Sequence, residues 1–119
     1  MGKKIETYAE LVRVCKSVGL GYLGSFMMEF LEKKEMWSNP ETKGHFMAFM
    51  RTEYDWCDSE SSTRTRINCM IRIIESGPKM VNDALDMVLD TNDHKLDVPE
   101  AKINAQMCKD MLASGELSY

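Results

Sequence analysis

The sequence marks where its own helices begin and end, and this constrains the fold more than any other feature. Short polar side chains precede four apolar stretches, where each can accept a hydrogen bond from an unpaired backbone N–H; they are Thr7, Asn39, Ser62 and Asp97. Three of the stretches end at a glycine, which adopts a left-handed conformation at the least cost; these are Gly19, Gly77 and Gly115. The pattern predicts an all-helical chain.

Apolar side chains recur with the helical period between these signals, and no alternating run predicts a strand. Six helices are expected, at about Thr7–Val18, Leu20–Met36, Pro40–Trp56, Thr63–Ser76, Lys79–Asp90 and Val98–Ser114. We therefore predict an all-α fold, a helical bundle that forms a single compact domain of about six helices over residues 1–119. Fraying is expected only at residues 1–5 and 116–119.

The composition narrows the classes of function. A net charge of −4 disfavours a generic binder of nucleic acid or of anionic membranes. No apolar run approaches the roughly 18 residues that a membrane span needs, and no signal peptide is apparent. We expect a cytoplasmic protein without a cofactor, because the four cysteines are scattered and no metal-binding spacing occurs.

The segment from Leu20 to Leu31 is apolar on nearly every side, apart from the small residues Gly21, Gly24 and Ser25. Such a helix is either central in its own domain or faces a partner, and the small residues allow another backbone to approach closely. With eleven methionines in the chain, we expect more apolar surface here than one small core can cover. The candidate interface comprises Tyr22, Phe26, Met27, Phe30, Trp37 and Trp56.

A second candidate site lies at the predicted helix start near Ser62. Free N–H groups, hydroxyls and guanidinium groups can together hold a phosphate or a carboxylate there. The candidate anion-binding residues are Ser62, Thr63, Arg64, Arg66 and Arg72. The favoured alternative is ordinary helix capping, with the arginines solvated or paired to acids just upstream. No glycine-rich turn accompanies the segment, so it is not a P-loop.

Other patterns carry little chemistry, and we predict no catalytic or metal-binding residue. Cys15, Cys69 and Cys108 occupy apolar helical positions typical of buried thiols, whereas Cys57 is the thiol expected to be accessible. Asp90–His94 begins like a calcium loop but lacks the central glycine and the bidentate glutamate, so a solvated loop is favoured.

The two helices around Gly77 resemble a helix-turn-helix in outline. The second of them carries Asp83, Asp86 and Asp90, which DNA phosphates would repel. DNA binding is therefore disfavoured.

The leading hypothesis is a non-enzymatic interaction protein that binds another protein, itself or both, in an inhibitor-, antitoxin- or immunity-like role. The alternative is a binder of nucleotides or other small anions at the Ser62–Arg66 helix start. A helix-turn-helix DNA-binding regulator is the third possibility considered.

Overall fold

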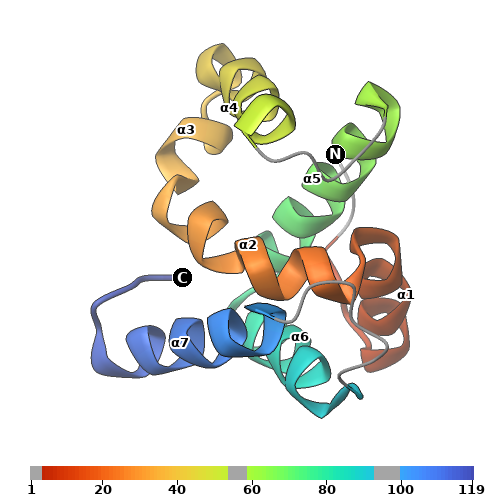
Figure 1. Cartoon of the computed structure of the whole chain (residues 1–119), viewed down its shortest axis with the longest axis vertical. Helices are drawn as coiled ribbons and strands as arrows, with labels where there is room; N and C mark the ends of the chain where they lie inside the picture. The colour runs from red at the N-terminus through yellow and green to blue at the C-terminus, as the bar shows by residue number, and fades with distance from the viewer. Residues whose placement is uncertain (1–3, 54–58, 93–99) are drawn as a thin grey trace.

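The computed structural model describes residues 4–53, 59–92 and 100–119, and the regular structure in these segments is entirely helical. These segments contain seven helices, which Figure 1 shows gathered into one globule with a radius of gyration of 13.3 Å. They are α1 (Tyr8–Val18), α2 (Leu20–Glu32), α3 (Lys34–Ser38), α4 (Pro40–Glu53), α5 (Glu60–Glu75), α6 (Pro78–Asp90) and α7 (Glu100–Ser114). The predicted all-α bundle is confirmed.

Helix α2 lies at the centre of the molecule. It packs against α1, α5, α6 and α7, while α3 and α4 lie together at one end of the globule and α6 and α7 at the other (Figure 1). Its side chains are buried on almost every side because they are apolar on almost every side. The fully buried members include Tyr22, Leu23, Met27 and Phe30.

At Gly24 of α2, the backbone of α7 comes close to the central helix. A Cβ atom at this position would lie 2.7 Å from the carbonyl oxygen of Ala101 and 2.8 Å from Cγ1 of Val88. Both distances are far shorter than a van der Waals contact. The close backbone approach expected from the small residues of this segment therefore occurs within the chain, between α2, α6 and α7.

The predicted helix 20–36 is wrong in one respect, because it is broken at Lys33 into α2 and α3. In a continuous helix, the carbonyl of Phe30 would accept a hydrogen bond from the N–H of residue 34. Here the buried indole N–H of Trp37 donates to that carbonyl at 2.7 Å. A side chain that enters the ladder of backbone hydrogen bonds is a common cause of a kink. The break turns α3 so that Trp37 enters the core.

Both described ends of the chain are held, although fraying was expected there. Ile5 is buried, and its N–H donates to Oγ of Ser76. Leu117 is also buried, and Nδ2 of Asn82 donates a hydrogen bond to the hydroxyl oxygen of Tyr119. These contacts correct the expectation for residues 116–119 and for Ile5, because an apolar side chain close to each end enters the core.

Most methionines fill the core, as expected for an unbranched side chain that adapts to irregular spaces. Met27, Met50 and Met70 are buried, and those of α3 and α6 pack partly against the same core. Met107 differs, because it is exposed on α7. In the described part of the chain, no helix is long and apolar enough to cross a membrane.

Replacing Gly24 by alanine should destabilise the protein by about 1–3 kcal/mol, because the new methyl group forces α2 and α7 apart. The measurement is the free energy of unfolding in urea. Gly44→Ala is the matched control, since a Cβ at Gly44 of α4 would meet no atom within 4 Å. That control should gain up to about 1 kcal/mol from helix propensity. Equal effects of the two substitutions would contradict the close approach of α7.

Candidate functional site

The helix that carries the predicted anion site begins one turn earlier than predicted. Ser59 caps α5, and its Oγ accepts a hydrogen bond from the N–H of Ser62 at 3.1 Å. The carbonyl of Ser59 accepts from the N–H of Thr63 and also from its hydroxyl, each at 3.1 Å. The N–H groups of Ser62 and Thr63 are therefore already bonded within the helix. The prediction of a helix start at Ser62 is wrong because Ser59, three residues upstream, supplies the same capping chemistry.

The arginines of α5 do not converge on one point. Nη1 of Arg66 donates to the carbonyl oxygen of Val18 at 2.5 Å, and its guanidinium lies 5.7 Å from the centre of the Tyr22 ring. The carbonyl groups at the end of a helix lack partners within it, so Arg66 caps the C-terminus of α1. Arg72 lies farther along α5, and its Nη2 is 3.7 Å from a carboxylate oxygen of Glu10 in α1. These contacts give Arg66 and Arg72 structural roles between α5 and α1.

Thr63 and Arg64 instead line a cleft between α4 and α5. The cleft has a volume of about 270 Å³, and α4 contributes the other lining residues, which are Gly44, Met47, Ala48 and Arg51. The structure thus keeps two of the five predicted anion-binding residues together and adds Arg51, which the sequence-based prediction missed. Arg51 lies thirteen positions before Arg64 in the sequence, and no local pattern joins the two.

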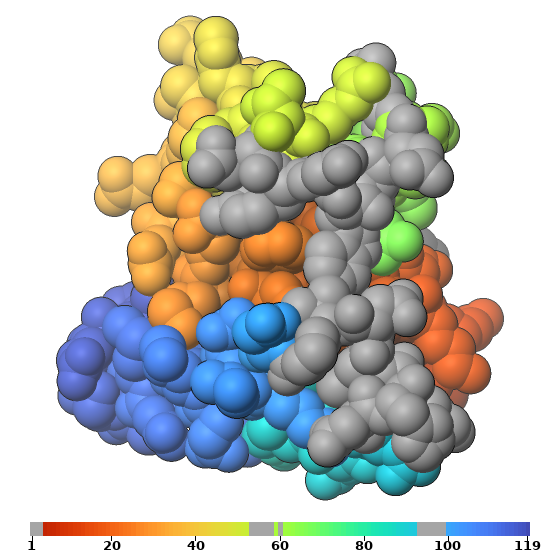
Figure 2. Space-filling view, viewed as in Figure 1, coloured from red at the N-terminus to blue at the C-terminus, as the bar shows by residue number. Residues whose placement is uncertain are grey.

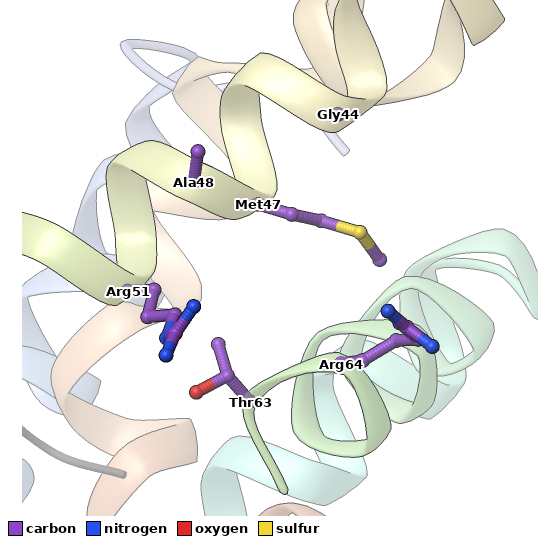
Figure 3. A pocket seen from close by; sticks show the side chains of 6 residues that line it. All are labelled: Gly44, Met47, Ala48, Arg51, Thr63 and Arg64. Carbon is purple, nitrogen blue, oxygen red and sulfur yellow. The ribbon is translucent and has the colours of Figure 1, made fainter. Parts of the chain in front are cut away.

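The lining of the cleft combines positive charge with apolar surface. In Figure 3, Met47 extends from α4 toward Arg64, and Arg51 turns toward Thr63. Thr63 is only 5% exposed, and because its hydroxyl donates to the carbonyl of Ser59, its methyl group is the part that faces α4 (Figure 3). A guanidinium group from each helix therefore borders a floor of methionine, alanine and threonine methyl groups.

The predicted interface residues of α2 and α3 lie inside the molecule. Tyr22, Phe26, Met27, Phe30 and Trp37 belong to the buried core, where Phe30 also packs edge-on against Phe46 of α4. The prediction that these five side chains face a partner is therefore corrected, since the chain itself covers them. The other interpretation of a helix that is apolar on every side, a central position, is the correct one. Trp56 lies outside the described residues.

The described thiols are held in the protonated form. Burial raises the pKa of Cys15 from 9.0 to about 12 and that of Cys108 to about 11. Burial also raises the pKa of Cys69, although the positive charge of Arg72 opposes this shift. Because the thiolate is the nucleophile and the metal ligand, these three side chains act as apolar groups at neutral pH. Cys57 lies outside the described segments.

The acidic side of α6 is partly paired within the chain. Asp83 accepts a hydrogen bond from Nζ of Lys79 at 2.9 Å, and Asp86 forms an ion pair with Lys109 of α7. Asp90 is exposed. Within the described segments, no group of three or more His, Cys, Asp and Glu residues is arranged to hold a metal ion. Asp93 and His94 of the calcium-like segment lie outside the described residues.

Comparison with known proteins identifies no relative: no family model matches the chain, and neither a curated protein nor a solved structure is significantly similar to it.

Replacing Arg66 by methionine should destabilise the protein by about 1–3 kcal/mol, because the carbonyl of Val18 loses a charged donor. Chemical unfolding measures this effect. Arg13→Met is the control, since Arg13 is an exposed arginine of α1. If the free energy of unfolding falls by the same small amount in both variants, Arg66 does not cap α1.

The free energy of unfolding should fall as the pH rises above about 9. Between the pKa of 9.0 in the unfolded chain and about 12 in the folded protein, the native state keeps the Cys15 proton that the unfolded state has released. The native state then binds more protons, so its stability falls with increasing pH. Urea unfolding from neutral pH to about pH 11 measures the slope. The Cys15→Ala variant, less stable at neutral pH, should show a shallower slope, and an unchanged slope would contradict the shift.

Proposed function

We propose that the protein binds a small anionic molecule in the cleft between α4 and α5. The observation that carries this proposal is the presence of Arg51 and Arg64, from two different helices, on the wall of one cleft. Guanidinium groups are permanently charged and present parallel N–H donors that match a carboxylate or a phosphate. The chain as a whole carries a net charge of −4, so binding of an anion depends on specific donors such as these two groups.

The floor of the cleft favours a ligand with an apolar portion. Met47, Ala48 and the methyl group of Thr63 offer carbon atoms rather than hydrogen-bonding groups, and methionine adapts its shape to what it contacts. A volume of about 270 Å³ lies just below the range for pockets that hold drug-sized molecules, which begins at roughly 300 Å³. The ligand class is therefore a phosphate or carboxylate that carries a small apolar group, or the phosphate end of a nucleotide.

This proposal relocates the anion site predicted from the sequence. The N–H of Ser62 donates to the side chain of Ser59 that caps α5, Arg66 caps α1, and Arg72 pairs with Glu10. Thr63 and Arg64 line the cleft together with Arg51. The geometry favours binding across two helices over binding at a helix start.

Protein–protein binding is the second candidate function, and α7 rather than α2 supports it. Ile103 and Met107 are large apolar residues of α7 that are exposed to solvent. Exposed apolar residues that adjoin one another beside polar ones are typical of interaction surfaces.

Thermal unfolding in the presence of inorganic phosphate, AMP, ATP, butyl phosphate and butyrate tests the anion proposal. A ligand at 100 times its dissociation constant stabilises the native state by about 2.7 kcal/mol, which raises the melting temperature by several degrees. We expect at least one compound of the panel to give such a shift, and an apolar phosphate to exceed inorganic phosphate.

Arg51→Gln and Arg64→Gln should each weaken binding of that compound by about tenfold or more, because each removes a charged donor. Arg13→Gln is the control, since Arg13 lines a separate hollow between α1 and α5. Titration calorimetry measures the three dissociation constants. The absence of any shift with the panel, or loss of binding only in Arg13→Gln, would overturn the cleft as the anion site.

A further inference from the structure

We infer that the ligand of the cleft between α4 and α5 is an anion with an unbranched aliphatic chain, and that this chain lies against α4 at Gly44. The inference rests on the proposed function and names the class of its ligand. Gly44 is exposed and lines the cleft together with Met47, Ala48 and Arg51 of the same helix. Helix α4 itself forms the upper outer part of the molecule in the space-filling view (Figure 2).

The packing of the described residues does not require a glycine at position 44. A glycine inside a helix lowers its stability relative to alanine. Gly24 offsets this loss by admitting the backbone of α7, but a Cβ atom at Gly44 would meet no atom within 4 Å. Positive φ is not the reason either, because Gly44 lies inside α4 and has the negative φ of a helix. What the missing side chain does provide is a strip of helix backbone that is open to the cleft.

The four cleft residues of α4 lie on one face of this helix. Gly44, Met47, Ala48 and Arg51 follow the spacing i, i+3, i+4 and i+7, which places side chains in a row. Figure 3 shows Gly44 and Arg51 at opposite ends of this segment. A helix rises about 1.5 Å per residue, so the two positions lie about 10 Å apart along its axis. An extended ligand whose anionic head contacts Arg51 therefore directs its chain toward Gly44.

The groups between these two ends suit an aliphatic chain. Met47 and Ala48 offer carbon and sulfur atoms, and the methyl group of Thr63 faces them from α5. An aliphatic chain needs no hydrogen bonds and gains free energy from leaving water in proportion to the area that it buries. At Gly44 the chain lies directly on the helix backbone, because no Cβ atom stands there. Chain length then sets the affinity among ligands that share one head group.

Titration calorimetry of the full chain with butyl phosphate and hexyl phosphate tests the inference. Hexyl phosphate should bind the wild-type protein about tenfold more tightly, because two further methylene groups leave water. Parallel titrations with butyrate and hexanoate distinguish a phosphate head from a carboxylate head. The same preference for the longer chain is expected with whichever head group binds.

Two substitutions place a side chain where the hexyl chain would lie. Gly44→Ala should weaken binding of hexyl phosphate by about fivefold, and Gly44→Leu should weaken it by about tenfold or more, with a smaller loss for butyl phosphate. Alanine and leucine are better helix formers than glycine, so the melting temperature without ligand should rise in both variants. A gain in stability together with a loss of affinity cannot arise from misfolding.

His45→Ala is the matched control. His45 is the exposed neighbour of Gly44 in α4 and is not one of the described residues that line the cleft. This substitution also raises helix propensity, but it should leave both dissociation constants unchanged. Arg51→Gln should weaken butyl phosphate and hexyl phosphate by the same factor, because it acts on the head group that the two ligands share.

Equal affinity of the wild-type protein for the two phosphates, or undiminished binding of hexyl phosphate by Gly44→Leu, would overturn this inference and leave anion binding in the cleft intact. An equal loss in His45→Ala would overturn the placement of the chain beside Gly44. Tighter binding of AMP or ATP than of hexyl phosphate would overturn the aliphatic class. If none of these anions binds the wild-type protein, the proposed function itself is wrong, and this inference is wrong with it.

Discussion

The contact between Gly24 of α2 and the backbone of α7 is the constraint on which the rest of the packing depends. Because no side chain separates the two helices at this point, the carbonyl of Ala101 and the side chain of Val88 both reach the central helix. This draws α6 and α7 onto one side of α2, while α1 and α5 cover another. The most apolar segment of the chain is thereby enclosed by four helices, and no partner is needed to cover it.

Enclosure of α2 changes where function is to be sought. An apolar helix that faces a partner and an apolar helix at the centre of a domain have the same sequence, because both exclude charged side chains all round. Once α2 is central, function is to be sought on the surface, where the cleft with Arg51 and Arg64 lies between α4 and α5 and where Ile103 and Met107 of α7 are exposed. The cleft lies where α4 packs against α5, whereas α7 packs directly against the central helix α2.

The three arginines of helix α5 make different contacts. Its three arginines leave the helix in different directions, since their spacing does not match a single helical face. Arg64 borders the cleft with α4, Arg66 caps the end of α1, and Arg72 meets Glu10. The sequence shows a cluster of positive charge, but a helix of 3.6 residues per turn disperses it.

The sequence by itself determined the features that depend on local chemistry. Helix ends follow from glycines that accept positive φ, and Gly19, Gly77 and Gly115 all do so, with φ between 85° and 112°. The cap of α1 at Thr7 and the start of α4 at Pro40 likewise depend only on residues at those helix ends. Tertiary structure alone decided the break at Lys33, the entry of Trp37 into the core, and the meeting of Arg51 with Arg64. Each of these depends on groups from separate turns or separate helices, and their energies arise only when those elements pack together.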